Sequence, residues 1–159
     1  MNNLSIKTYC IDTSAIIDPW RNRFPPDIFP SIWQEIDNLI INNQLKAPRE
    51  VYNELENQDD EILEWAKNHK NNLFIDLDEY EQSLVIDILN KFPKLIDYNK
   101  TKPDADPFII ALAKSKGYTV VTMERPGSFE YPKIPFVCKD YNVRCINILE
   151  FIRELGWSF

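Results

Sequence analysis

Residues 106–124, with the sequence DPFIIALAKSKGYTVVTME, predict the fold class most clearly. Residues 108–113 are apolar around the whole circumference of a helix, so this helix should lie inside the molecule. Gly117 ends the helix, and Tyr118–Met123 predicts a β-branched strand of the continuous kind found in the middle of parallel sheets. A buried helix that leads directly into a buried strand is typical of an α/β domain.

The rest of the chain alternates in the same way. Further strands are predicted over residues 6–11, 73–77, 134–138 and 144–146, and further helices over 28–41, 49–56, 80–92 and 147–155, with another beginning at Asp59-Asp60. Because 159 residues suit one compact domain, we expect a single domain over residues 1–159 with a central, mainly parallel sheet.

The composition excludes several classes of protein. Eighteen Lys and Arg against 25 Asp and Glu give a net charge of −7, which argues against general coating of nucleic acid. Three glycines are too few for a P-loop or a dinucleotide-binding loop. The three cysteines form no Cys-x-x-Cys pair and there is one histidine, so we do not expect a zinc site.

We expect a soluble, cytoplasmic protein. An odd number of cysteines in apolar, strand-like surroundings fits a reducing compartment. The amino terminus has a single Lys before a short, interrupted apolar run, which predicts no export signal. No window approaches the roughly 18 uninterrupted apolar residues of a membrane span, so we expect no membrane partner.

Acidic side chains follow the predicted strands. Asp12 comes directly after the first strand, Glu124 follows the strand 118–123, and Asp106 begins the buried helix, with Asp104 two residues earlier. Glu54 lies on the helix 49–56 at the edge of its apolar stripe. In parallel sheets the ligand crevice lies beyond the carboxyl ends of the strands. Converging carboxylates there are what Mg²⁺ or Mn²⁺ requires.

Each acid also has a structural interpretation. Asp12 could cap a helix, and Asp106-Pro107 is a helix-start signature with the carboxylate on the positive helix end. Helix geometry does not choose between Glu54 and Glu56, because the two acids flank the same apolar stripe. Glu124, taken alone, is an ordinary loop acid.

Four motifs in order resemble the signatures of PIN domains. They are DTSAII at residues 12–17, PREVYNEL at 48–55, ADPFIIALA at 105–113 and VVTME at 120–124. The resemblance extends over residues 6 to about 150 and implies a PIN-like, three-layer α/β/α fold. PIN domains are Mg²⁺- or Mn²⁺-dependent nucleases, and small single-domain members are commonly the VapC-like toxins of toxin–antitoxin pairs.

The resemblance assigns roles to individual residues. The acidic quartet would be Asp12, Glu54, Asp106 and Glu124, which selects Glu54 over Glu56. Asp12, Asp106 and Glu124 would hold the metal, and Glu54 would position or deprotonate the attacking water. Either Thr13 or Ser14, together with Thr122, would provide hydroxyls beside the quartet. The sequence departs from the family at Glu124, where Asp is more common, in the additional acid Asp104, and in a longer segment over residues 19–30.

The charge is unevenly distributed along the chain. Residues 50–90 hold 12 acids against two lysines, a net charge of −10, so the rest of the chain carries +3 of the total of −7. We expect nucleic acid to avoid that acidic segment. Arg21, Arg23, Arg49 and Arg125 are the candidates for holding phosphates, and the alternative is that they are solvated surface charges.

The leading hypothesis is a metal-dependent endoribonuclease that uses metal-activated water and is the toxin of a type II toxin–antitoxin pair. The resemblance implies a product with a 5′-phosphate. The expected partners are an RNA substrate, an antitoxin protein and a second copy of the chain. The alternative is a non-catalytic PIN-like module that binds RNA or protein. A phosphatase-like hydrolase with Asp12 as nucleophile ranks last, because Ser14 stands where a second Asp is needed.

Overall fold

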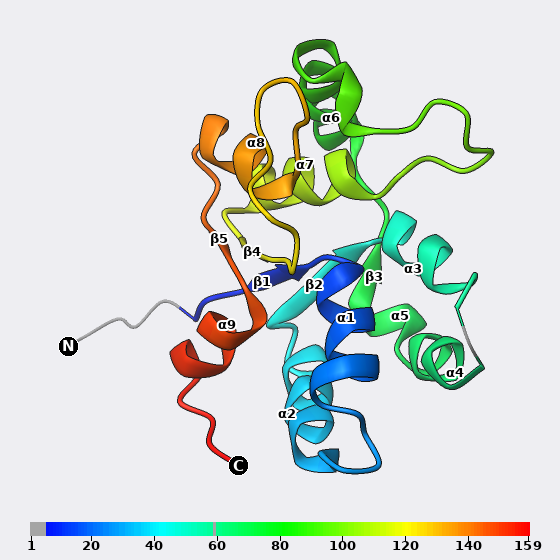
Figure 1. The fold of residues 1–159 in the computed structure, drawn as a ribbon, viewed down its shortest axis with the longest axis vertical. Helices are drawn as coiled ribbons and strands as arrows, with labels where there is room; N and C mark the ends of the chain where they lie inside the picture. The colour runs from blue at the N-terminus through cyan, green and yellow to red at the C-terminus, as the bar shows by residue number, and fades with distance from the viewer. Residues whose placement is uncertain (1–5, 59) are drawn as a thin grey trace.

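Five parallel strands form the centre of the structure, a computed structural model that describes residues 6–58 and 60–159 (Figure 1). The strands are β1 (Tyr9–Ile11), β2 (Leu45–Pro48), β3 (Phe74–Ile75), β4 (Thr119–Val121) and β5 (Cys145–Ile146). Their order across the sheet is β3-β2-β1-β4-β5, and every neighbouring pair is parallel. The expected central parallel sheet is therefore confirmed.

Helices cover both faces of this sheet. The α-helices are α1 (Ser14–Asp18), α2 (Pro30–Ile41), α3 (Arg49–Leu55), α4 (Asp60–Asn68), α5 (Lys70–Leu73), α6 (Glu79–Lys91), α7 (Asp106–Lys116), α8 (Ile134–Asp140) and α9 (Ile148–Glu154). A π-helical turn, η1 (Pro19–Arg23), continues α1, and a 3₁₀ turn, η2 (Pro93–Leu95), follows α6. Figure 1 shows α6, α7 and α8 on one side of the sheet and α1, α2 and α9 on the other. This is the three-layer α/β/α arrangement.

The buried helix and strand predicted around Gly117 are both present. α7 packs against β1, β2 and β4, and its residues 109–113 are all buried. Gly117 ends the helix with φ +71°, a left-handed conformation that favours glycine, and the chain then enters β4. β4 is buried throughout and pairs Val121 with Ile11 of β1. This pairing brings the carboxyl ends of β1 and β4 to one edge of the sheet.

Local signals explain where several other helices begin. Asp78 and Glu81 form a reciprocal capping box at the start of α6, and Asn147 and Glu150 do the same for α9. α4 begins at Asp60, as expected from the acidic pair; Asp59 itself lies outside the described residues. Across residues 6–58 and 60–159, every helix is too short or too polar to cross a membrane.

The structure corrects two predictions of secondary structure. The strand predicted over residues 134–138 is wrong, because this segment forms the helix α8. Its apolar residues Ile134, Val137 and Cys138 recur at helical spacing and are buried together on one side. The strand β2 was not predicted, since LKAP carries a lysine and a proline; it exists because it pairs on both sides, with β1 and with β3.

Candidate active site

A cleft of about 400 Å³ opens at the carboxyl ends of β1 and β4. It receives Asp12 from the end of β1, Asp106 from the start of α7, Glu54 from α3 and Glu124 from the chain after β4. The four acids predicted from distant parts of the sequence therefore line one cavity, which we call the carboxylate cleft. Its full lining is Asp12, Thr13, Ser14, Ile17, Asp18, Arg21, Asn22, Glu54, Asp106 and Glu124.

Asp12 is held by two hydroxyl groups. Its Oδ2 accepts hydrogen bonds from Ser14 Oγ at 2.6 Å and from Thr122 Oγ1 at 2.8 Å, and the residue is only 3% exposed. Burial raises the pKa of Asp12, and the two hydroxyl hydrogen bonds act in the opposite direction. Ser14 Oγ also accepts from Met123 N, and Thr122 Oγ1 accepts from Glu124 N. These contacts join the end of β1 to the end of β4.

Thr13 occupies the N-cap position of α1 and is buried. Its Oγ1 makes no hydrogen bond of normal geometry within the described residues, although it lies near enough to Glu54 to lower the pKa of that carboxyl. Thr13 provides no side-chain cap hydrogen bond to α1. Hydrogen bonds from the backbone N–H groups of Thr13 and Ser14 help to lower the pKa of Asp12, so its carboxylate also lies against the first turn of this helix.

Glu54 connects α3 to the start of α7. Its Oε1 accepts a hydrogen bond from Ala105 N at 2.6 Å, whereas Glu56 is exposed at the end of α3. Burial raises the pKa of Glu54, and the negative charges of Asp12 and Asp104 add to that effect. The structure thus separates two acids that helix periodicity could not: Glu54 lies in the cleft and Glu56 points to solvent.

Asp106 lies among the other acids of the cleft, and its pKa is strongly raised. Burial and the charges of Asp12, Glu124, Glu54 and then Asp104 raise its pKa to about 9. It is the first residue of α7, but the helix has no side-chain cap hydrogen bond. The carboxyl group is therefore buried among like charges without a compensating bond, an arrangement that costs stability and is common at functional sites.

Glu124 holds the chain that follows β4. Its Oε2 accepts a hydrogen bond from Ile134 N at 3.0 Å, which fixes the first turn of α8 and closes the loop over residues 125–133. Burial and the charge of Asp12 raise the pKa of Glu124, while the Ile134 N–H and the Lys133 ammonium lower it. The longer Glu side chain at this position thus reaches both the cleft and the next helix.

Asp104 lies outside the carboxylate cleft. Its Oδ2 accepts from Asp97 N at 2.8 Å, and its Oδ1 accepts from Lys100 Nζ at 2.5 Å. These bonds give Asp104 a structural task in the loop before α7. Its charge still acts on the cleft, because it contributes to the raised pKa values of Glu54 and Asp106.

The donor chemistry of the cleft suits a hard divalent cation, since it combines carboxylate and hydroxyl oxygens with uncompensated negative charge. The side chains as they stand do not form a ready coordination shell. Within residues 6–58 and 60–159, no group of three or more His, Cys, Asp or Glu residues is arranged to hold a metal ion. Instead, Glu54 and Glu124 each use one carboxylate oxygen to accept a hydrogen bond from a backbone N–H.

Of the four arginines predicted to hold phosphates, Arg21 lines the cleft, where its Nη2 donates to Gln58 Oε1 at 2.8 Å. Arg23 is paired with Asp18 at 2.5 Å, and Arg49 pairs with Asp76. Arg125 is exposed directly after Glu124.

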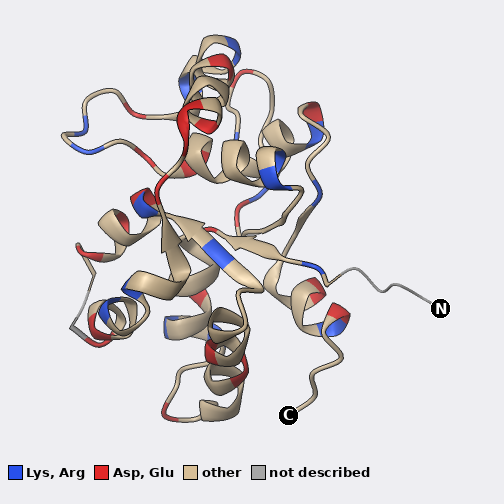
Figure 2. Ribbon diagram, turned by 180° about the vertical axis from the view of Figure 1, so that it is seen from behind, with Lys and Arg blue, Asp and Glu red and all other residues tan. Residues whose placement is uncertain are grey.

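Figure 2 shows basic and acidic segments interspersed over the helices of both layers. α3 lines the carboxylate cleft although it belongs to the acidic segment 50–90. The expectation that nucleic acid avoids this segment therefore concerns residues 60–90, from α4 onward.

Comparison with known proteins gives the family. Residues 9–159 match the sequence model described as Domain of unknown function (DUF4411). The chain belongs to this family. No curated protein matches the chain significantly.

Two solved structures resemble this DUF4411 chain. The first is VapBC2 from Rickettsia felis bound to a DNA fragment from their promoter, with a TM-score of 0.53 and 18% identity over 88% of this chain and 98% of the other. The second is FitAcB from Neisseria gonorrhoeae, with a TM-score of 0.50 and 18% identity over 88% of this chain and 97% of the other. At this identity the likeness concerns the fold, and the fold is PIN-like.

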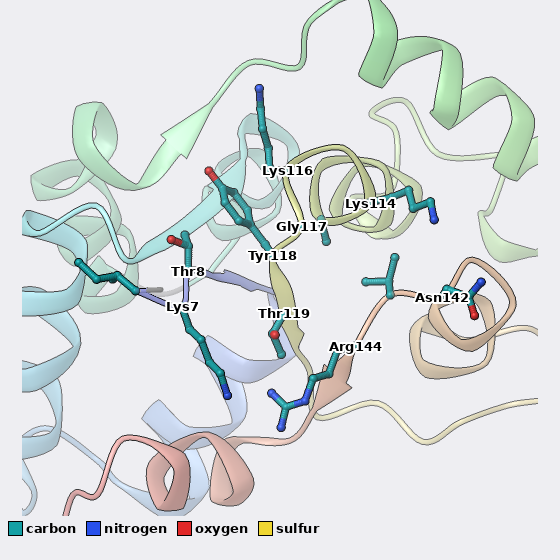
Figure 3. Close-up of a pocket in the computed structure, with 12 residues that line it drawn as sticks. Lys7, Thr8, Lys114, Lys116, Gly117, Tyr118, Thr119, Asn142 and Arg144 are labelled. Atoms are coloured by element: carbon teal, nitrogen blue, oxygen red, sulfur yellow. The ribbon is translucent and has the colours of Figure 1, made fainter. Parts of the chain in front are cut away.

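A different hollow, of about 530 Å³, lies at the amino ends of β1 and β4 (Figure 3). Figure 3 shows the Lys114 and Lys116 ammonium groups directed away from each other. Arg144 is paired with Glu154, and Lys7 Nζ lies 3.9 Å from the same carboxylate. Because these cations diverge or are already compensated, this hollow is a weaker candidate than the carboxylate cleft.

Sequence reasoning missed Asp18 and Asn22 as cleft residues and a row of amides beside Glu54. Asp18 and Asn22 follow Ser14 at helical spacing, so the continuation of α1 into η1 was the signal that could have found them. The amides have a signal too, because Asn53 and Asn57 are four residues apart.

Proposed function

We propose that this DUF4411 chain is a metal-dependent endoribonuclease and the toxin component of a type II toxin–antitoxin pair. The observation that supports the proposal most directly is the convergence of Asp12, Glu54, Asp106 and Glu124 on one cleft at the carboxyl edge of a PIN-like sheet. Asp106 lies among these like charges without a hydrogen bond from any described residue, which costs stability, and this arrangement fits a task for which negative charge is needed.

In this proposal Asp12, Asp106 and Glu124 hold the cation. Bound Mg²⁺ or Mn²⁺ would supply a water of lowered pKa and neutralise charge on the phosphate. Ser14 and Thr122 keep the Asp12 carboxylate oriented through the hydrogen bonds described above.

Glu54 would accept a proton from the attacking water; in support, burial raises its pKa and so makes it a stronger base than an exposed carboxylate. Arg21 reaches the same cleft and would attract the phosphate.

The two structural neighbours support the toxin part of the proposal. Both names, VapBC2 and FitAcB, denote assemblies, and the Rickettsia felis one is bound to DNA from its own promoter. A toxin of this kind is expected to have a partner protein, whose natural place is a short neighbouring reading frame that encodes a DNA-binding antitoxin.

The test is a cleavage assay on single-stranded and structured RNA and DNA with Mg²⁺, Mn²⁺ or EDTA. Wild type should cut RNA only with metal, whereas Asp12→Asn and Asp106→Asn should each fold and lose cleavage, because Asn keeps the size of Asp but not its charge. Full activity in both variants would remove these residues from the site. Induced expression in a bacterial host should arrest growth for wild type and not for Asp12→Asn, and co-expression of the neighbouring reading frame should relieve the arrest.

The second candidate is a PIN-like module that binds RNA or protein without cutting. It is favoured by one observation: among the described residues no three acids are arranged as a coordination shell, and Glu124 is bonded to α8. This function predicts RNA or protein binding that EDTA does not weaken, with no cleavage under any metal condition.

A further inference from the structure

A second cavity, of about 580 Å³, adjoins the carboxylate cleft. Glu54 belongs to both cavities and forms the wall between them. One side of the second cavity is the end of α3, and the other is the loop over residues 99–104, which runs from η2 toward α7 (Figure 1). We call this space the amide cavity.

Carboxamides dominate the α3 side of the amide cavity. Asn53, Asn57 and Gln58 lie there, and Asn99 faces them from the loop. Asn53 and Glu54 lie in the last turn of α3, and the turn that follows brings Asn57 and Gln58 to the same cavity, with their N–H groups donating to the carbonyls of Glu54 and Leu55. The side-chain Oε1 of Gln58 accepts a hydrogen bond from Arg21 Nη2, which connects the amide cavity to the carboxylate cleft.

The asparagines of this cavity are available to a ligand. Within the described residues, the side chains of Asn53, Asn57 and Asn99 make no hydrogen bond. Each carboxamide offers two donors and one acceptor oxygen. The lining is Asn53, Glu54, Asn57, Gln58, Asn99, Lys100, Thr101, Lys102, Pro103 and Asp104, so an occupant must be polar and rich in hydrogen-bonding groups.

Hydrogen bonds within the loop itself hold the other side of the cavity in place. Asp104 accepts from Asp97 N, and Asp97 Oδ1 accepts from Asn99 N at 3.0 Å, so the turn that carries Asn99 is fixed by its own carboxylates. Lys100 is paired with Asp104, and Lys102 is exposed at the rim. Cations at the rim suit a phosphate outside the cavity.

The charge distribution indicates what part of a ligand enters. Glu54 and Asp104 in the walls repel an anion, so a phosphate is disfavoured inside. A neutral nucleobase has the donors and acceptors that the amides match, and its amino group can donate to a carboxylate. Asparagine pairs in bidentate fashion with adenine, which makes adenine the best match among the four bases.

We propose that the amide cavity is a base-reading subsite for single-stranded RNA, with Asn53, Asn57 and Asn99 selecting an unpaired adenine beside the phosphate that lies in the carboxylate cleft. The inference rests on the proposed function for the location of that phosphate. A duplex would hide the base edges that the amides contact, so the subsite takes an unpaired nucleotide. Base-edge contacts add specificity, while the cations only position the backbone.

The test is binding of fluorescein-labelled RNA nonamers of adenosine, cytidine or uridine, followed by anisotropy, with Asp12→Asn as the cleavage-silent background. We expect the adenosine nonamer to bind at least about fivefold more tightly than the uridine nonamer, the lower end of what one bidentate pair contributes. Adding Asn53→Ala and Asn57→Ala should abolish this difference and leave uridine binding within about twofold. Asn90→Ala, an exposed asparagine on α6, is the matched control and should change neither.

The outcomes separate this inference from the proposed function. Equal binding of the three nonamers, a uniform loss in the asparagine variants, or no binding at all overturns the base-reading subsite. Selective binding of adenosine without cleavage by wild type in Mn²⁺ refutes the nuclease and leaves the subsite standing. Should the double variant unfold, Asn57→Asp alone provides the same test, because it keeps the shape of the side chain and removes the amide donors.

Discussion

Replacing Asp106 by Asn should stabilise the metal-free protein while abolishing its proposed activity. Burial and four neighbouring acids raise the pKa of Asp106 to about 9, from 3.8 in the unfolded chain. The folded state therefore binds this proton more tightly than the unfolded state. Wild-type stability should fall as pH rises from about 4 toward 9, and the loss should be complete above the folded pKa. Asn has no proton to lose, so it removes this dependence.

The size of the effect follows from the same shift. At about 1.36 kcal/mol per pH unit, the interval from 3.8 to 7 gives about 4 kcal/mol at neutral pH as the upper limit. Part of the raise comes from Asp12, Glu124 and Glu54, which take up protons themselves. We therefore expect Asp106→Asn to gain about 2–4 kcal/mol in free energy of unfolding at pH 7 and almost nothing at pH 4.

Urea unfolding followed by tryptophan fluorescence at pH 4 to 9 measures this gain. Asp18→Asn is the matched control, because Asp18 lines the same cleft but hydrogen bonds from Arg23 and Asn22 lower its pKa. The control should lose less than about 1 kcal/mol, and that loss should appear above pH 4 and vanish in acid. If Asp106→Asn destabilises the protein at pH 8, or leaves its pH profile unchanged, Asp106 is not held among uncompensated carboxylates.

Three further outcomes are expected. In thermal melts, Mn²⁺ at a hundredfold excess over its dissociation constant should stabilise the wild-type protein by about 2.7 kcal/mol. The double variant Asp12→Asn, Asp106→Asn should be stabilised much less, and equal shifts in the two proteins would argue against a metal site. Glu124→Ala should speed tryptic cleavage in the loop 125–133, because the first turn of α8 loses its acceptor; unchanged proteolysis would contradict this. Arg21→Glu should weaken RNA binding and reduce its salt dependence, whereas Lys67→Glu on α4 should not; the reverse ranking would misplace the binding face.

The sequence predicted secondary structure best in the segments that are buried on all sides, because few arrangements can bury so many apolar residues. α7 and β4 were predicted because a continuous apolar run on both sides of Gly117 fits only a central helix and strand. Residues 134–138 gave an ambiguous signal, since a run of five mostly apolar residues is compatible with a buried strand and also with the buried side of a short helix. The bond from Ile134 N to Glu124 starts the helix, and no local pattern reveals a partner ten residues earlier.

The same distinction applies to the candidate site: the positions of some residues follow from the sequence, and those of others depend on tertiary contacts. That Asp12, Asp106 and Glu124 meet could be predicted, because the carboxyl ends of neighbouring parallel strands share one edge of a sheet. That Asp104 is bonded within its own loop, and that Arg23 is paired with Asp18, depends on tertiary contacts that residue type and spacing do not determine.

The carboxylates of the cleft differ in how firmly the fold holds them, and this difference bears on how the site would work. Asp12 accepts from two hydroxyls, and Glu54 and Glu124 each accept from a backbone N–H, so all three are positioned before any ligand arrives. The Asp106 carboxyl makes no hydrogen bond within the described residues, and only burial and repulsion act on its pKa. A cation would therefore find three acids already in place and one whose deprotonation it must itself make favourable. Because the pKa of Asp106 is raised to about 9 and the pKa values of Asp12, Glu54 and Glu124 are raised as well, a cation should bind more strongly as pH rises and these carboxyls lose their protons.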